Sequence, residues 1–327
     1  MSFRTLMRYL DPAFIDAPEA GRSLPEAGGA RSDSVPRPVT MRNGRAIAPT
    51  SLDREGFVLL RLTEAENRRL VALGDPFSYL TQRPADRSAH HRVFEEAVMR
   101  ATGACYVRCF NFVLRRSSIE GVHTLPSGDD SARGAVNDVH TDFTPDAPAL
   151  RNLAALAESL GLAGCRQTVL NCWRNAASSG PVRQWPMAVC DASSVRPEEL
   201  VARVSPENGN RIHNLLHSAR HAWCYFPRMR ANEEALLFKQ WDTDERWARF
   251  TPHTAFNAPR EGHPAAAPAP ARESCEVRLV CFFAEEGGVG GGGRELSEGL
   301  RRALRELDRS GVGLVSPAAL EEAPSRL

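Results

Sequence analysis

The chain has 327 residues, of which 42% are hydrophobic and 25% charged, a composition typical of one large globular domain with short extensions, or at most two domains. Its 41 Lys and Arg residues nearly balance its 40 Asp and Glu residues, which argues against nucleic acid or an anionic membrane surface as a partner. No segment approaches the roughly 20 consecutive apolar residues of a membrane span, and the first residues lack the apolar core of a secretory signal.

The eight cysteines indicate a reducing environment. They are scattered through apolar runs without any C-x-x-C pair, as expected of buried thiols that neither form disulfides nor bind zinc. We therefore expect a cytoplasmic protein with no membrane and no nucleic-acid partner.

The first 48 residues are rich in Pro, Gly, Ala and Ser and show no sustained periodicity, so we expect residues 1–48 to form a loosely structured arm. Order is predicted to begin near Thr50. In chain order, the next expected elements are a turn at 51–56, a strand at 57–62, helices at 63–73 and 87–102, a strand at 105–114 and a polar loop at 115–134.

The remainder is dominated by short strands. After a helix at 152–162, β-branched and aromatic runs predict strands at 167–173, 185–191, 222–226, 235–241 and 275–283. Short strands separated by turn signals favour a sandwich or barrel over a parallel βαβ sheet. The expected fold is therefore mixed α+β and mainly β, within residues 49–285.

Residues 286–327 are expected to form a linker and a helix. The glycine run at 287–293 is followed by no Lys-Ser/Thr pair, which favours a flexible linker over a phosphate loop. The segment 295–308 places leucines on one helical face, at Leu296, Leu300, Leu304 and Leu307. Such a face predicts a docking helix, through which we expect the chain to form a homodimer.

The most informative motif is His140-Thr141-Asp142. On a strand, residues two positions apart point to the same face, so this imidazole and carboxylate can bind one metal ion. They supply two ligands of a 2-His-1-carboxylate site, which leaves positions on iron open for a cosubstrate and dioxygen. Because His-x-Asp is common in unrelated caps and loops, the motif requires a third ligand elsewhere.

His253 is the expected third ligand, on a separate strand of the same barrel. Further along the chain, Arg272 and Ser274 again share one strand face. A guanidinium binds a carboxylate through two hydrogen bonds and the serine hydroxyl adds another, so Arg-x-Ser is suited to the distal carboxylate of an oxoacid.

These motifs, in this order, resemble the non-haem Fe(II)/2-oxoglutarate-dependent oxygenases, and within them the CmcJ/AsaB-like hydroxylase/desaturase branch, which includes gibberellin desaturase-like enzymes. The resemblance covers roughly residues 45–285, and its collinearity is more specific than any single piece. The segments that carry it are 52–57, 139–144, 171–174, 186–195, 221–229, 237–242, 253–256 and 272–278.

The resemblance implies a double-stranded β-helix (jelly-roll, cupin-like) core with flanking helices. It implies Fe(II) held by His140, Asp142 and His253, with 2-oxoglutarate and O2 as cosubstrates and Arg272 and Ser274 on the distal carboxylate. Enzymes of this family couple decarboxylation of 2-oxoglutarate to hydroxylation or desaturation of an unactivated C–H bond. A small organic substrate of specialised (secondary) metabolism is expected.

The chain departs from the family pattern at three points. The segment between His253 and Arg272 is unusually long, so Arg278 remains an alternative anchor for the cosubstrate. Arg174-Asn175 replaces the usual Arg-Pro, and Trp241-Asp242 replaces the usual Tyr-Asp. The last two changes concern the substrate pocket more than the metal site.

Other polar residues carry open alternatives. Asn171, Arg174, His221 and Tyr225 are each either lining residues of the pocket or structural groups. His213, His217 and His221 have the i, i+4, i+8 spacing of a helical zinc stripe, but the flanking sequence disfavours a helix. Asp191 and Asp242 are expected to be turn or cap residues.

Two other classes of function remain as alternatives. One is another metal-dependent enzyme, either a 2-oxoglutarate-independent iron oxidase or a hydrolase, that keeps the His-Asp-His set but uses Arg272 differently. The other is a non-catalytic jelly-roll binding protein.

Overall fold

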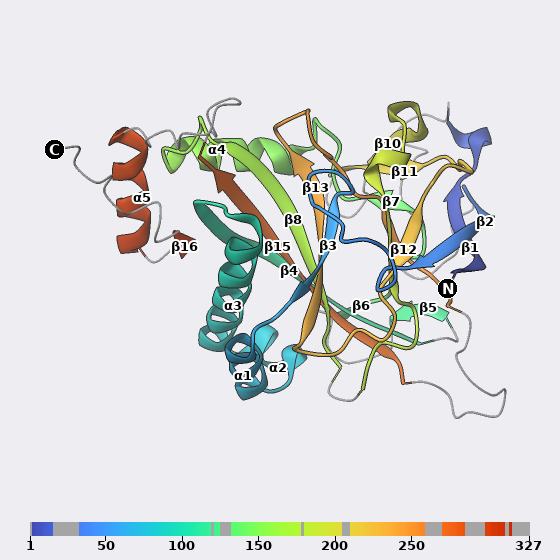
Figure 1. The fold of residues 1–327 in the computed structure, drawn as a ribbon, viewed down its shortest axis with the longest axis horizontal. Coiled ribbons are helices and arrows are strands. Elements are labelled where there is room, and N and C mark those ends of the chain that lie inside the picture. Colours follow the sequence, from blue (N-terminus) through green and yellow to red (C-terminus); the bar gives the residue numbers. More distant parts are fainter. Residues whose placement is uncertain are drawn as a thin grey trace.

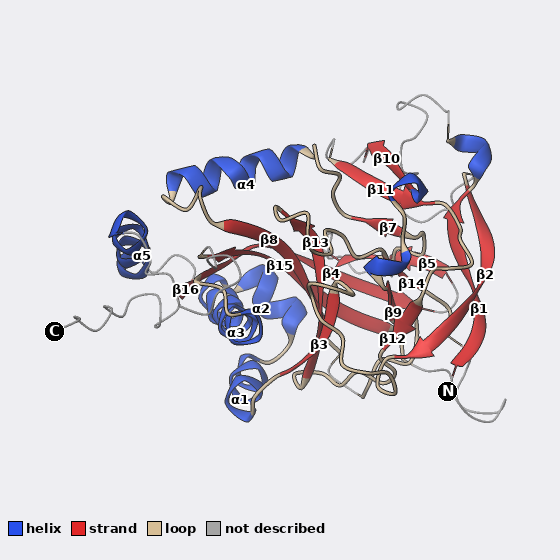
Figure 2. Ribbon diagram, turned by 45° about the horizontal axis from the view of Figure 1, so that its top comes forward, coloured by secondary structure: helices blue, strands red, loops and turns tan. Residues whose placement is uncertain are grey.

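The computed structural model describes residues 2–15, 33–118, 121–124, 132–177, 180–204, 210–258, 270–284, 298–310 and 314–315. Within them the chain forms two eight-stranded sheets, with helices gathered on one side (Figures 1 and 2). This mainly β architecture confirms the expected jelly-roll core with flanking helices. Among the helices in the described part of the chain, none has the length and apolar character needed to span a bilayer.

The first sheet carries the short strands that hold the two histidines of the predicted metal site. Its neighbours are antiparallel except for the parallel pair β2 and β12. Its order is β1 (Ser2–Leu10), β2 (Ser34–Asn43), β12 (Trp223–Tyr225), β9 (Met187–Cys190), β14 (His253–Ala255), β7 (His140–Thr141), β11 (Arg211–Leu215) and β10 (Leu200–Val204).

The second sheet is built on long antiparallel strands. Its order is β16 (Leu314–Val315), β4 (Tyr106–Ser118), β15 (Arg272–Phe283), β8 (Arg166–Asn175), β13 (Glu234–Asp242) and β3 (Phe57–Arg61), and β5 (Gly121–Thr124) and β6 (Ala132–Arg133) also pair with β4. Alternation along β8 separates the two faces: Leu170 and Cys172 belong to the core beneath the helices, whereas Trp173 packs between the sheets.

Helices α1 (Glu64–Leu73), α2 (Pro76–Gln82) and α3 (Pro84–Thr102) cover the outer face of the second sheet. Thr63 starts α1 with a capping box, in which its hydroxyl accepts from Glu66 N–H and the Glu66 carboxylate accepts from Thr63 N–H. Helix α4 (Pro148–Ser159) packs near one end of the same sheet. Leu304 of α5 (Glu298–Ser310) is buried in the same apolar cluster as Leu150 and Leu153 of α4. The short 3-10 turns are Pro12–Phe14, Ala192–Ser194 and Pro197–Glu199.

The expectation of a loosely structured arm is wrong for residues 2–10 and 34–43. These residues form β1 and β2, and β2 continues the first sheet by pairing with β12. Alternating side chains of both strands are buried, including Tyr9, whose hydroxyl accepts from the indole N–H of Trp223 at 2.6 Å. The prolines within β2 obscured this alternation, although Pro36 and Pro38 precede the residues that pair with β12, so that this part of β2 has a neighbouring strand on one side only.

The other differences concern short elements. Helix α2 begins with Pro76 after the Asp75 cap, a start signal in a segment too short for clear periodicity. The expected loop at 115–134 instead contains the end of β4 together with β5 and β6. Strands β10 and β11 were also missed, and the glycine run at 287–293 lies outside the described residues.

Gly56 is the tightest backbone position beside the metal-binding strands. Its φ is +86°, and a Cβ there would lie 2.4 Å from the Thr251 hydroxyl oxygen. Its carbonyl accepts two hydrogen bonds, one from Lys239 N–H and one from the Thr251 hydroxyl, both at 2.8 Å. Gly56 therefore lets the turn before β3 approach the segment that leads into β14.

We predict that Gly56→Ala destabilises the fold by about 1–3 kcal/mol more than Gly74→Ala, measured by urea unfolding. Gly74 is a matched control because its φ is +84° but no atom lies within 4 Å of its would-be Cβ. Both variants introduce backbone strain, so the difference isolates the contact with Thr251. Equal losses of stability would contradict this account.

Candidate metal centre

The structure brings His253 together with His140 and Asp142, from which the sequence separates it by more than 100 residues. Strands β7 and β14 are neighbours, with His140 directly opposite His253 and their ring centroids 4.3 Å apart. Asp142 follows β7, and its Oδ1 lies 3.5 Å from His140 Nε2 and 3.8 Å from His253 Nε2. One nitrogen or oxygen from each side chain lies within 4.8 Å of the others, an arrangement that can hold a metal ion.

Backbone carbonyls fix the tautomers of both histidines. His140 Nδ1 lies 2.8 Å from the carbonyl oxygen of Asp138, and His253 Nδ1 lies 3.1 Å from that of Thr251. Because a carbonyl can only accept, each Nδ1 carries the proton and each Nε2 presents its lone pair toward Asp142. Burial, and then the neighbouring His140, lower the pKa of His253 to about 3, so His253 is neutral near pH 7.

The second oxygen of Asp142 is held by the other sheet. Oδ2 accepts from Asn171 Nδ2 at 2.8 Å and from the Arg278 guanidinium at 3.0 Å, while Asp142 N–H donates to Gln240 Oε1 at 2.9 Å. Burial raises the pKa of Asp142, but the charge of Arg278 and the contact with His140 outweigh it and hold this pKa well below its usual range. Asp142 is therefore an anion whose Oδ1 alone faces the histidines.

Arg272 is a buried cation at the start of β15. Only 3% of its surface is exposed. It donates through Nη1 to the carbonyl of Trp185 at 2.7 Å, its Nε has no hydrogen-bond partner, and its guanidinium lies 5.7 Å from the Trp173 ring centroid. Burial, and then the charge of Arg115, lower its pKa to about 9, so it remains charged near neutral pH. Among the described residues, no carboxylate forms an ion pair with it.

Arg278 differs from Arg272 in its partners. Arg272, Ser274, Glu276 and Arg278 occupy alternate positions of β15 and so share its inner face. Arg278 binds Asp142 and also contacts Glu276 Oε1 at 3.2 Å. Arg278, the alternative anchor for the cosubstrate, thus already binds two carboxylates of the protein, whereas the Nε of Arg272 has no partner.

Three residues named as possible pocket residues lie elsewhere. Arg174 is three positions from Asn171 on β8 and so faces the helices, where it donates to the Tyr79 hydroxyl at 2.6 Å and to His90 Nε2 at 3.1 Å. His221 and Tyr225 pack on the outer side of the first sheet. Of the four candidate pocket residues, only Asn171 contacts the His140, Asp142 and His253 cluster. The alternation of side chains along a strand, and not their polarity, decides which face of the sheet a residue lies on.

The three-histidine stripe does not form. His213 lies on β11, where its Nδ1 contacts the Thr141 hydroxyl at 3.1 Å, and His221 lies between Tyr9 and Glu199. Asp191 caps the turn at 192–194, as expected. Asp242 also has the contact expected of a turn residue, since its Oδ1 accepts from Asp244 N–H at 2.9 Å, and it joins a buried ion-pair network with Lys239 and Arg166.

Sequence reasoning missed Gln240 and Glu276. Gln240 is fully buried on β13 and fixes the backbone of Asp142. Glu276 is buried beside Arg278, and burial raises its pKa. Both are polar residues within apolar strand sequences. Gln240 lies two positions from Phe238 and Glu276 two positions from Ser274, so each shares the strand face of that residue, and this pattern can be read from the sequence.

A jelly-roll that presents two histidines and one carboxylate between its sheets defines the class of metal-dependent jelly-roll enzymes. Comparison with known proteins makes this class specific. A family model described as an oxidoreductase/YMDC permease-like domain matches residues 13–282. The hydroxylase/desaturase efuI of Hormonema carpetanum is 28% identical over 261 residues, 72% of this chain and 80% of that protein.

Two further matches agree. The hydroxylase/desaturase asaB of Aspergillus flavus is 30% identical over 164 residues, 45% of this chain and 69% of that protein. The solved structure of the iron and alpha-ketoglutarate-dependent endoperoxidase NvfI superposes with a TM-score of 0.64 at 23% identity, covering 86% of this chain and 98% of that one, and so shares the fold. The chain belongs to this oxidoreductase family, in its Fe(II)/2-oxoglutarate-dependent hydroxylase/desaturase branch, as its sequence motifs predicted.

We predict that Arg278→Gln weakens Co(II) binding by about 10–100-fold, because Asp142 loses the charged donor that fixes Oδ2. Asn171→Ala is the matched control, since it removes the neutral donor to the same oxygen and should weaken binding less. Titration of each purified variant, followed by Co(II) absorption, measures the effect.

A second measurement on these variants distinguishes the two roles of Arg278. If Arg278→Gln kept its Co(II) affinity but lost affinity for 2-oxoglutarate, Arg278 would be the cosubstrate anchor and the present interpretation would be wrong.

Proposed function

We propose that the chain binds Fe(II) through His140 Nε2, His253 Nε2 and Asp142 Oδ1 and oxidises an unactivated C–H bond of a small organic molecule. The observation that carries this proposal is the convergence of these three atoms, with both histidines in the metal-binding tautomer. Two imidazoles and one carboxylate suit Fe(II) and leave coordination positions for other ligands. When bound, the iron supplies the reaction of O2 with 2-oxoglutarate that drives the oxidation.

Arg272 and Ser274 are the proposed site for the distal carboxylate of 2-oxoglutarate. Arg272 supports this role because it is charged and buried, with an unpartnered Nε and no carboxylate partner among the described residues. An unpaired buried guanidinium is costly, and an anionic cosubstrate would offset that cost. Ser274 shares the strand face of Arg272 and is also buried, so its hydroxyl is placed to add a second donor.

The substrate is proposed to be a small molecule of specialised metabolism, hydroxylated or desaturated at carbon. The relatives named hydroxylase/desaturase support this choice of reactions. Sheet residues that surround the metal-binding cluster include the Phe238 ring, 4.8 Å from that of His253, so one wall of the site is aromatic. Such a wall excludes water from the reacting atoms.

A cytoplasmic location is also proposed, on the state of the cysteines. All eight are free and seven are buried, which supports a cytoplasmic location. We also propose a homodimer through α5; Leu304 of its leucine face is buried within the chain, so the contact would use other residues of the helix. The division into residues 1–48, 49–285 and 286–327 remains a proposal, with β1 and β2 pairing the first segment to the oxygenase core.

The test is O2 consumption and succinate release by the purified chain with Fe(II) and 2-oxoglutarate. We predict that His140→Ala or Asp142→Ala abolishes both, because either change removes a metal ligand. Arg272→Gln should retain iron binding and raise the 2-oxoglutarate KM by about 10–100-fold through loss of the charged anchor.

Two outcomes would contradict the proposal. O2 consumption without succinate would indicate a 2-oxoglutarate-independent oxidase, and binding of neither Fe(II) nor 2-oxoglutarate under anaerobic conditions would indicate a non-catalytic binding protein. A 2-oxoglutarate KM unchanged in Arg272→Gln would move the anchor elsewhere.

A further inference from the structure

Strand β7, which carries His140, has few partners of its own. It is two residues long, and it pairs with one residue of β14 and with two residues of β11. Beyond its end, the side chain of Gln240 holds the backbone of Asp142. The backbone before His140 depends on a different part of the chain, the N-terminal strand pair formed by β1 and β2.

This strand pair holds the backbone immediately before His140. The Arg8 carbonyl of β1 accepts from Val139 N–H at 2.9 Å, and Arg8 and Asp138 form a parallel β-bridge. Asn214 Nδ2 donates to the Val139 carbonyl at 3.2 Å, and the side chain of Val139 is fully buried. Both backbone groups of Val139 are therefore fixed, one of them by the first strand of the chain.

The side chain of Arg8 neutralises a buried charge at the same point. Asp138 is only 8% exposed, and its Oδ1 accepts no hydrogen bond. Arg8 Nε lies 3.6 Å from that oxygen and is the sole ion-pair partner of Asp138 among the residues that the structure describes. The Asp138 carbonyl in turn binds His140 Nδ1 at 2.8 Å. Arg8 therefore neutralises the residue whose carbonyl orients a metal ligand.

Arg8 belongs to a strand that is itself firmly held. Its guanidinium donates to Ser34 Oγ at 3.0 Å and to the Ser34 carbonyl at 2.7 Å. The next residue, Tyr9, is fully buried, and its hydroxyl accepts from Trp223 N–H at 2.6 Å and contacts His221 Nδ1 at 3.1 Å. These bonds set the position of Arg8 independently of its ion pair.

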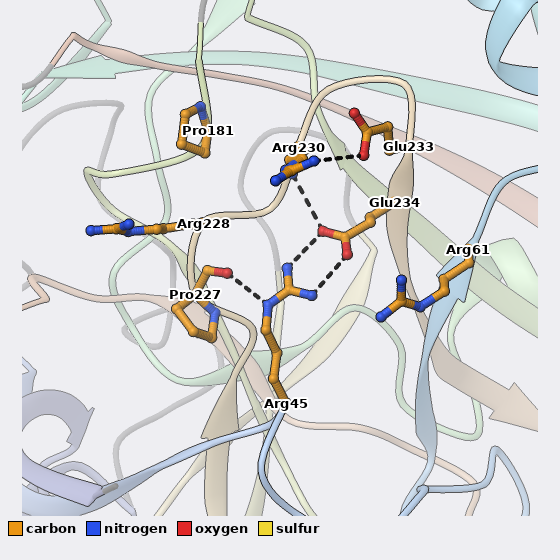
Figure 3. Close-up of a pocket in the computed structure, with 8 residues that line it drawn as sticks. All are labelled: Arg45, Arg61, Pro181, Pro227, Arg228, Arg230, Glu233 and Glu234. Atoms are coloured by element: carbon orange, nitrogen blue, oxygen red, sulfur yellow. Dashed lines mark hydrogen bonds and ion pairs between the residues drawn. The ribbon is translucent and has the colours of Figure 1, made fainter.

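The other end of the strand pair is joined to the second sheet. Arg45, just after β2, donates to both carboxylate oxygens of Glu234 at 2.8 and 2.6 Å, and its Nε donates to the Pro227 carbonyl at 2.9 Å (Figure 3). Glu234 begins β13, the strand that also carries Gln240. The strand pair is thus tied to both sheets, and its contact with residues 138–139 is part of a rigid framework.

We propose that Arg8 is a positioning residue for the metal centre and acts on His140 through Asp138. A buried carboxylate that loses its cation is strongly unfavourable, so without Arg8 the Asp138 side chain turns toward solvent. That movement displaces the carbonyl that holds His140 Nδ1. The inference rests on the proposed Fe(II) site and adds that the N-terminal strand pair supports one of its ligands.

The experiment is Co(II) titration of the full-length chain, of Arg8→Gln and of Arg4→Gln. Arg4 is a matched control because it lies on the same face of β1 and is exposed. We expect Arg8→Gln to weaken Co(II) binding about tenfold, the lower end of the effect of groups that orient metal ligands. The visible absorption of the Co(II)-saturated protein should also change, because His140 meets the metal in a different orientation. Arg4→Gln should leave both unchanged.

A double variant separates positioning from a general loss of stability. Asp138→Asn removes the charge that Arg8 neutralises, so Arg8→Gln/Asp138→Asn should bind Co(II) more tightly than Arg8→Gln and recover the spectrum of the unaltered chain. A variant that is only less stable keeps that spectrum once saturated.

Three results would overturn the role of Arg8: equal affinities of Arg8→Gln and Arg4→Gln, an unchanged spectrum of saturated Arg8→Gln, or no recovery in the double variant. Failure of the unaltered chain to bind Co(II) would instead overturn the Fe(II) site on which the inference rests.

Discussion

The central constraint of this molecule is the division of the Asp142 carboxylate between two sheets. Oδ1 faces the histidines of β7 and β14, while Oδ2 is bound by Asn171 of β8 and Arg278 of β15. Buried charge is costly, and here charged and neutral donors from the second sheet offset that cost. The same bonds therefore align the sheets, keep the carboxylate ionised and leave one oxygen directed at the histidines.

Two of the buried arginines show how one side chain can be buried in two ways. Arg174, on the outer face of β8, is surrounded by neutral acceptors from Tyr79, His90 and Asn232, which spread its charge within the protein. Arg272, on the inner face of β15, has one carbonyl partner and an unpartnered Nε. The Nε of each arginine lacks a partner, but Arg174 has three side-chain acceptors whereas Arg272 has a single carbonyl, so Arg272 has more donors left for an anion.

The sequence predicted most of the long elements, because periodicity and turn signals are local. The His-x-Asp motif and the family resemblance singled out the three residues that converge in the structure. The strands that carry the ligands could not be predicted in this way, since β7 has two residues and β14 three, and their pairing is set by the register of distant strands. Strand parity was the neglected signal for Arg174. For His221 no local signal existed, because its partner Tyr9 lies on β1, 212 residues away.

Crossing between the sheets explains why strain and polar groups gather at one end of the sandwich. Residues 176–186 connect β8 of the second sheet to β9 of the first, and 226–233 connect β12 of the first to β13 of the second. Each connection buries an apolar side chain, Val182 or Met229, and each contains positive φ at non-glycine residues, Trp185 in the first and Arg228 and Asn232 in the second. The turn at Trp185 aims its carbonyl at Arg272. The crossing of the chain between the sheets thus positions the backbone partner of the proposed cosubstrate anchor.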